Sequence, residues 1–175
     1  AISSIILAPT RELAIQVHDE LVKLAKYEKL NVVAVYGGAP IHNQIRDIKR
    51  ANIVVGTPGR VLDHIRRGTL PLDSVEFLVL DEADEMLNMG FIDDMEEIMK
   101  SIPEERQTLL FSATMPAQIK KLTKKYLKED SVHIVIARKE LTGSTITQNF
   151  FEVNNSERFE TLCRLIDFDN PSAGI

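Results

Sequence analysis

The sequence predicts an α/β fold in which a parallel β-sheet is flanked by helices, and three observations support this prediction. Short apolar runs alternate with helical patterns along most of the chain, as in successive βαβ units. Several runs are continuously apolar and rich in Val and Ile, which is typical of parallel strands covered on both faces. The chain also has the composition of a globular protein, with 44% hydrophobic and 27% charged residues among 175.

Six short apolar runs in the first part of the chain are the expected strands. They cover residues 3–8, 32–36, 53–56, 75–80, 107–112 and 132–137. Each is bounded by turn-forming or polar residues, and each has the length of an ordinary strand. We expect right-handed crossovers between them, because parallel strands connected through helices almost always have that hand.

Helical periods separate these runs. The first covers residues 11–27, where Ala14, Val17 and Leu21 share one face of a helix. Thr57 can cap a second helix that Pro58 opens, since proline suits the first turn, and a glycine at position 68 can end it. Two further helices are expected over residues 91–102 and 117–128.

The pattern changes near residue 143. Residues 141–145 (Leu-Thr-Gly-Ser-Thr) predict a linker, and a strand over 148–153 and a helix over 157–167 follow it. We expect one domain over residues 1–143, and a linker with the start of a second domain over 144–175. Because predicted elements reach both ends, we also expect a piece of a larger chain, truncated at both ends.

Charge and composition exclude several classes of protein. The net charge is −5, but residues 81–105 alone carry −9, which leaves the other 150 residues mildly basic. No apolar run approaches the roughly 20 residues of a membrane span, and no secretory signal is visible. The single cysteine, Cys163, excludes an internal disulfide framework and a cysteine-based zinc site. We therefore expect a cytoplasmic protein.

The strongest chemical signal is Asp81-Glu82-Ala83-Asp84, directly after the 75–80 run. Ligands bind to α/β sheets at the carboxyl ends of their strands. There Asp81 could hold Mg²⁺, directly or through water, and Glu82 could orient a water for attack on a γ-phosphate. The alternative is an acidic helix N-terminus favoured by the helix dipole.

Hydroxyl side chains lie at the end of the next predicted strand. Ser112 is the last residue of the 107–112 run, and Thr114 lies two residues beyond it, so both hydroxyls can lie beside the carboxylates at the same sheet edge. Alternatively, they are a polar strand end that caps a helix beginning after Pro116.

Two further segments join a strand to a helix start, where exposed N–H groups attract anions. Arginine in each adds a donor suited to phosphate, and a glycine pair between them permits close approach of a backbone. Singly, each segment can also be an ordinary turn. Together they predict contacts to phosphate and ribose. The residues of these segments are Pro9, Thr10, Arg11, Gly37, Gly38, Thr57, Pro58, Gly59 and Arg60.

These segments occur in a recognisable order. They are Pro-Thr-Arg-Glu-Leu-Ala at 9–14, the paired glycines, Thr-Pro-Gly-Arg at 57–60, Asp-Glu-Ala-Asp at 81–84 and Ser-Ala-Thr at 112–114. This series of motifs resembles the DEAD-box family of ATP-dependent RNA helicases. The resemblance implies a RecA-like fold, and ATP and Mg²⁺ as cofactors. It also implies that the residues at 9–11, 37–38 and 57–60 bind RNA, mainly through its sugar-phosphate backbone.

The resemblance also implies a role for each acidic residue. Asp81 would belong to the Mg²⁺ shell, through water, and Glu82 would face the attacking water. Asp84 would bond Ser112 or Thr114 and so link the nucleotide site to the RNA site. In these terms, residues 1–143 are a first RecA-like domain lacking its N-terminal part, and residues 144–175 are the linker and the start of a second.

Some parts of the family pattern do not occur in this sequence. The phosphate-binding loop and the adenine-reading glutamine motif would lie before Ala1, and the arginine finger after Ile175. We therefore expect ATP-dependent RNA helicase activity from the complete protein and none from this chain alone. The alternatives are a DNA-translocating relative and a non-catalytic RNA-binding or scaffolding module.

Overall fold

The computed structural model describes residues 1–136 and 149–171. The chain divides into two compact units, Ala1–Val132 and His133–Ile175. The first holds a five-stranded sheet, and the second holds α7 (Arg158–Asp169), preceded by a single 3₁₀ turn, η1 (Asn155–Glu157). The predicted boundary at residue 143 lies outside the described residues.

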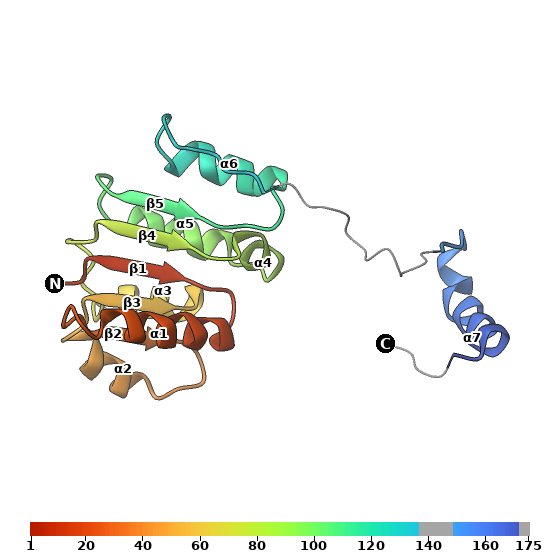
Figure 1. The fold of residues 1–175 in the computed structure, drawn as a ribbon, viewed down its shortest axis with the longest axis horizontal. Helices are drawn as coiled ribbons and strands as arrows, with labels where there is room; N and C mark the ends of the chain where they lie inside the picture. Colours follow the sequence, from red (N-terminus) through yellow and green to blue (C-terminus); the bar gives the residue numbers. More distant parts are fainter. Residues whose placement is uncertain (137–148, 172–175) are drawn as a thin grey trace. The chain divides into compact units, whose positions relative to one another are not determined.

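All five strands of the first unit run parallel. They are β1 (Ser4–Leu7), β2 (Val32–Val35), β3 (Ile53–Gly56), β4 (Phe77–Leu80) and β5 (Gln107–Leu110). Their order in the sheet is β2-β3-β1-β4-β5, which Figure 1 shows from one face. The predicted α/β fold with a parallel sheet is confirmed, and each of these strands matches a predicted run to within a few residues.

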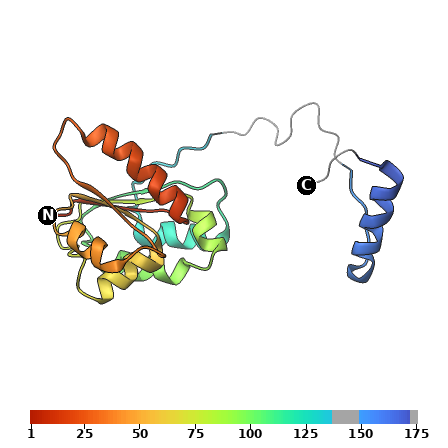
Figure 2. The same ribbon diagram turned by 90° about the horizontal axis from the view of Figure 1, so that it is seen from below.

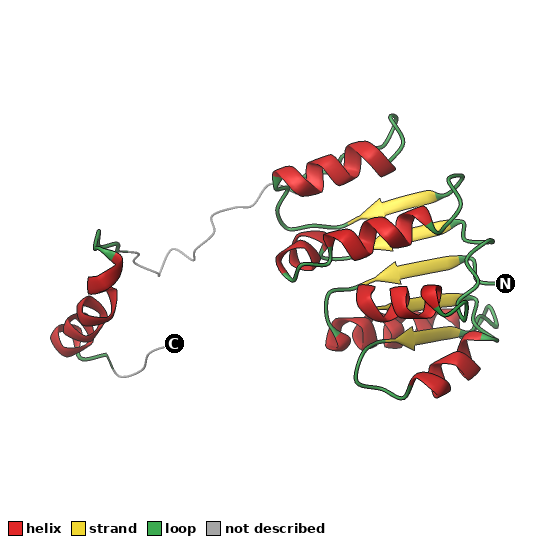
Figure 3. Ribbon diagram, turned by 180° about the vertical axis from the view of Figure 1, so that it is seen from behind, coloured by secondary structure: helices red, strands yellow, loops and turns green. Residues whose placement is uncertain are grey.

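Helices cover both faces of the sheet. On one face lies α1 (Arg11–Ala25), and on the other lie α3 (Pro58–Arg66), α5 (Ile92–Lys100) and α6 (Ala117–Tyr126) (Figures 2 and 3). Two shorter helices complete the unit, α2 (Ile41–Ile48) and α4 (Ala83–Asn88). The first of these was not predicted, and the second begins within the acidic motif, where the sequence offered a helix start as the alternative interpretation.

The larger part of the core lies beneath α3 and α5. Fully buried side chains of the strands, such as Ile5, Leu7 and Leu78, belong to one apolar cluster with Leu62 of α3 and Ile98 of α5. The cluster on the α1 face is smaller and includes Ala14, Ile6 and Val55. Burial on both faces explains why the strands are apolar without alternation.

Two predicted strands are wrong over their described residues. Residues 132–136 and 149–153 have no regular secondary structure, and side chains such as Ile134 and Phe150 are 81% and 85% exposed. A strand needs a neighbour that accepts and donates its backbone hydrogen bonds, and the described chain gives these segments none. Residues 137 and 148, at the ends of the two predictions, lie outside the described residues.

No helix in the described part of the chain has the length and apolar character that a membrane crossing requires.

Candidate functional site

The predicted site residues gather at one edge of the sheet, where all five strands end. The register pairs Leu7 with both Gly56 and Leu80, and Leu80 with Leu110, so the strands end level with one another. The segment after each strand therefore begins at the same edge. In Figure 1 this is the edge toward which the strand arrows point.

The acidic motif begins immediately after β4. The backbone N–H of Asp81 donates to the carbonyl of Leu7 on the neighbouring strand (2.9 Å), which extends the ladder by one residue. Asp81 is half-buried and Glu82 is exposed. Neither carboxylate forms a hydrogen bond or salt bridge with any residue that the structure describes, so both can accept from a ligand or from water.

Glu82 has a strained backbone. Its φ of 51° and ψ of 53° put it in the left-handed region, which costs a non-glycine residue about 1–3 kcal/mol. The turn it makes starts α4, whose first residue, Ala83, is fully buried and donates its N–H to the Phe111 carbonyl (3.0 Å). Strain of this kind is typical of functional sites, and it lies at the residue that the sequence assigned to the attacking water.

Asp84 is bonded to the segment after β5. The N–H and hydroxyl of Thr114 both donate to Asp84 Oδ2, at 2.9 and 2.7 Å. In return, the Asp84 N–H donates to Ser112 Oγ (3.1 Å), and the Ser112 hydroxyl donates to the Thr114 carbonyl (2.7 Å). The expected contact between Asp84 and a hydroxyl of this segment is therefore present, with both hydroxyls in one closed cluster.

This cluster keeps Asp84 ionised. Partial burial is the largest single effect and would raise the pKa of Asp84, but hydrogen bonds from the Thr114 hydroxyl and from nearby backbone N–H groups outweigh it and lower the pKa. At neutral pH the carboxylate is thus an acceptor only, which fits the two donors that Thr114 directs at it.

The predicted RNA-binding residues lie at the same sheet edge, after β1, β2 and β3. Thr10 caps α1, since its hydroxyl accepts from the Leu13 N–H (3.3 Å), and Pro9 is buried before it. Arg11 is exposed, and its guanidinium carbon lies 5.0 Å from the centre of the Tyr36 ring, within range of a cation–π contact. Arg11 is therefore in contact with the residue that precedes the two glycines.

The two glycines after Tyr36 differ in what they require. Gly38 has a φ of +81°, a conformation that other residues rarely adopt. Gly37 has no such φ, and a Cβ built on it meets nothing within 4 Å. Both are exposed. No packing inside the described chain demands a glycine at position 37.

The segment at residues 57–60 contains the start of α3. Pro58 occupies the first turn as predicted, but Thr57 makes no capping hydrogen bond with its side chain, so that part of the prediction is wrong. The Val61 N–H is instead bonded to the Thr57 carbonyl (3.0 Å), in the ordinary helical way. Gly59 is exposed, and Arg60 is half-buried.

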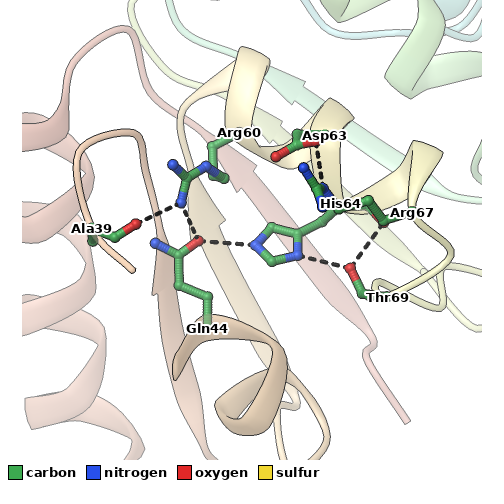
Figure 4. A network of polar contacts seen from close by, with 7 residues as sticks. All are labelled: Ala39, Gln44, Arg60, Asp63, His64, Arg67 and Thr69. Atoms are coloured by element: carbon green, nitrogen blue, oxygen red, sulfur yellow. Dashed lines mark hydrogen bonds and ion pairs between the residues drawn. The ribbon is translucent and has the colours of Figure 1, made fainter. Parts of the chain in front are cut away.

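Arg60 turns toward the loop that follows β2. Its Nη1 donates to the Ala39 carbonyl (3.0 Å) and to Gln44 Oε1 (3.2 Å), as Figure 4 shows. No acidic side chain of the described residues lies within salt-bridge distance of it, and its Nε and Nη2 donate to no described residue. Arg60 thus retains a positive charge and two guanidinium nitrogens, Nε and Nη2, that can donate to an external anion.

Two residues near this site were missed from the sequence. Tyr36 supports Arg11, and the buried Gln44 accepts from Arg60. The available signal was the spacing of Ile41, Ile45 and Ile48, which marks one helix face and places position 44 on it. A polar residue at an inward position indicates a buried hydrogen bond, although its partners cannot be read from the sequence.

The carboxylates suit a magnesium ion in company with phosphates. No three potential ligands among His, Cys, Asp and Glu gather in the described part of the chain. Mg²⁺ needs fewer, since it keeps several waters and is commonly held by one or two carboxylates plus substrate phosphates. Asp81, with unused carboxylate oxygens at the carboxyl end of a buried strand, fits that pattern.

Known proteins resemble this chain in sequence over most of its length. Residues 1–122 match the family described as DEAD/DEAH box helicase. The chain is 51% identical over 175 residues to the DEAD-box ATP-dependent RNA helicase CshA of Bacillus subtilis, covering 99% of this chain and 35% of that protein. It is 55% identical to the ATP-dependent RNA helicase CshA of Listeria monocytogenes, covering 99% of this chain and 34% of that protein.

A solved structure shares the fold. The crystal structure of a DEAD box protein from the hyperthermophile Methanococcus jannaschii aligns with a TM-score of 0.74 and 54% identity, over 95% of this chain and 44% of that one. The chain spans about a third of the length of the curated relatives it matches.

Proposed function

The chain belongs to the DEAD/DEAH box helicase family, and from this premise we propose that the full-length protein is an ATP-dependent RNA helicase. It would couple ATP hydrolysis to the unwinding or remodelling of RNA duplexes. The observation that carries the proposal is the closed cluster of Asp84, Ser112 and Thr114. That cluster ties the acidic motif to the next strand end, at the sheet edge where the arginine and glycine segments also lie.

In this proposal the β4 end serves ATP. Asp81 would hold Mg²⁺ through water, and the ion would neutralise charge on the phosphates when bound. Glu82 would accept a hydrogen bond from the attacking water and orient it toward the γ-phosphate. Its exposed carboxylate and strained backbone support this assignment, because the turn directs position 82 away from the core while Ala83 stays buried.

The ends of β1, β2 and β3 would bind RNA. Arg11 and Arg60 would pair with phosphates, and the exposed turn at Gly37 and Gly38 would lie against the sugar-phosphate backbone. The empty space around position 37 supports this role, since a glycine that no internal contact requires suits close approach by a partner. Such contacts recognise the backbone of any RNA sequence.

The domain assignment rests on the same premise. We assign residues 1–143 to a first RecA-like domain, and residues 144–175 to a linker with the start of a second. A cytoplasmic location stays a prediction from the sequence.

The test is catalysis by the full-length protein on matched substrates. Phosphate release and strand separation are measured on an RNA duplex and on a DNA duplex of the same sequence, with ATP and Mg²⁺. The proposal predicts ATP turnover stimulated by RNA, and separation of the RNA duplex. Unwinding of DNA instead would favour a DNA-translocating enzyme, and RNA binding without turnover would favour a non-catalytic RNA-binding or scaffolding module.

A further inference from the structure

One buried amide lies at the centre of the polar network drawn in Figure 4. Gln44 of α2 is only 6% exposed. Its Nε2 donates to the Tyr36 carbonyl (3.0 Å), and its Oε1 accepts from Arg60 Nη1 (3.2 Å) and from the ring of His64 (2.9 Å). A buried polar group with all its partners in place specifies geometry, since leaving any partner unpaired is costly.

The partners fix which way the amide faces. The Tyr36 carbonyl can only accept, so it must meet the NH₂ group, and the Arg60 guanidinium can only donate, so it must meet the oxygen. His64, which is fully buried, therefore donates from Nε2 to the same oxygen. Its other ring nitrogen lies 2.9 Å from the hydroxyl of Thr69, so the ring is held from both sides.

Through these bonds Gln44 holds both ends of the loop after β2. The Tyr36 carbonyl at the start of the loop is bonded to Gln44 directly. The Ala39 carbonyl beyond the two glycines is bonded to Arg60, which is bonded to Gln44. The Tyr36 ring also lies beneath the Arg11 guanidinium. All three predicted RNA-binding segments thus meet at this one amide or at a residue bonded to it.

We propose that Gln44 is a positioning residue for RNA binding, which directs the Arg60 guanidinium and sets the path of the loop over residues 36–40. The inference rests on the proposed function, because it needs that edge to bind RNA. Gln44 is too buried to touch RNA itself, so it acts through Arg60 and the loop. His64 supports this role by donating a hydrogen bond to the amide oxygen of Gln44.

The test is a double-mutant cycle in the full-length protein, with Gln44→Met, Arg60→Ala and both together. Met has a similar volume to Gln but forms none of the three hydrogen bonds. The measurements are the free energy of unfolding, and the concentration of a single-stranded oligouridylate that gives half-maximal stimulation of ATP hydrolysis. Asn43→Met, at an exposed position of the same helix, is the matched control.

We expect Gln44→Met to raise the half-maximal oligouridylate concentration about tenfold, while the rate at saturating RNA stays within about twofold of wild type. Adding Gln44→Met to Arg60→Ala should have much less effect, because the group it positions is gone. The control should behave as wild type. A purely structural Gln44 would instead lower stability and leave the RNA requirement unchanged, which would overturn the inference.

The cycle separates this inference from the proposed function. If Arg60→Ala alone leaves the RNA requirement unchanged, the proposed RNA site is wrong at Arg60, and the positioning role fails with it. If Arg60→Ala weakens RNA binding but Gln44→Met does not, or if the two effects simply add, only the positioning role is wrong.

A second variant covers the case in which Gln44→Met does not fold. Gln44→Glu keeps the size of the side chain and the acceptor for Arg60 and His64. It also adds a negative charge beside Arg60, which would compete with RNA phosphate for the guanidinium. If Gln44 acts through Arg60, the RNA requirement should rise and its dependence on salt should weaken. An unchanged requirement and an unchanged salt dependence would contradict the proposal.

Discussion

Two glycines at the same sheet edge should respond to alanine in opposite ways. A Cβ at position 56 would lie 2.5 Å from Val35 Cγ2, 2.6 Å from Val61 Cγ2 and 2.7 Å from the Val35 carbonyl oxygen. That oxygen already accepts from the Thr57 N–H (3.1 Å), so it cannot withdraw without weakening the bond. At position 37 the same added carbon meets nothing within 4 Å.

The expected sizes follow from these contacts. Overpacking costs about 1–3 kcal/mol, and a weakened hydrogen bond adds about 1 kcal/mol. Gly56→Ala should therefore lower the free energy of unfolding by about 2–4 kcal/mol, or the melting temperature by about 4–16 °C for a domain of this size. Gly37→Ala should leave stability unchanged or raise it by up to about 1 kcal/mol, yet weaken RNA binding about tenfold, the equivalent of about 1.4 kcal/mol.

Thermal unfolding and RNA titration of both variants in the full-length protein test this pair. The fold requires the first glycine, and the proposed RNA partner requires the second. Wild-type stability in Gly56→Ala would contradict the packing argument. Wild-type RNA affinity in Gly37→Ala would contradict the proposed approach of RNA to this loop.

Three further predictions concern single side chains. Arg60→Ala should weaken binding to all single-stranded RNA sequences about equally and reduce the salt slope by about 0.7, as measured by titration at several salt concentrations; a loss confined to one sequence would count against it. Thr114→Val removes the hydrogen bond from the Thr114 hydroxyl to Asp84 but keeps the bond from the backbone N–H. The rate of duplex unwinding should therefore fall more than the rate of ATP hydrolysis. Equal losses of both rates would argue against a role of Thr114 in linking the ATP site to the RNA site. Burial, then the charge of Arg60, lowers the pKa of His64 from 6.5. As the pH falls, the unfolded chain therefore takes up this proton before the folded chain does, and the free energy of unfolding should fall below about pH 6.5. Urea unfolding of wild type and of His64→Gln, each at pH 8 and pH 5, should show that the variant loses this part of the pH dependence. An identical pH dependence in both proteins would refute the prediction.

The sheet could be predicted because its strands are buried on both faces and so are continuously apolar. The same signal failed at residues 132–136, since a local pattern does not reveal whether a partner strand exists. The helix over 41–48 was missed because it is short and a polar residue, Gln44, occupies one of its inward positions. Burial of that amide depends on hydrogen bonds to Tyr36, Arg60 and His64, which lie outside the helix itself.

The candidate site was predictable to the extent that it depends on strand order. Carboxylates and hydroxyls that follow neighbouring parallel strands must lie at one edge, and Asp84 and Thr114 do so. The left-handed backbone of Glu82 could not be predicted, because no local signal distinguishes it from an ordinary helix start. The orientation of the Arg60 side chain could not be predicted from the sequence either, since its hydrogen-bond partners come from a separate loop and helix.

The most direct test of the central claim compares Glu82→Gln with Asp81→Asn in the full-length protein. The measurements are the ATPase rate and the affinity for RNA in the presence of a non-hydrolysable ATP analogue. Glu82→Gln keeps the shape of the side chain and removes the carboxylate that we propose orients the water, so turnover should be abolished while ATP-dependent RNA binding remains. Asp81→Asn should weaken the proposed Mg²⁺ shell and so impair both. Turnover near the wild-type rate in Glu82→Gln would contradict the assignment of Glu82, and equal loss of RNA binding in both variants would contradict the division of roles between these two residues.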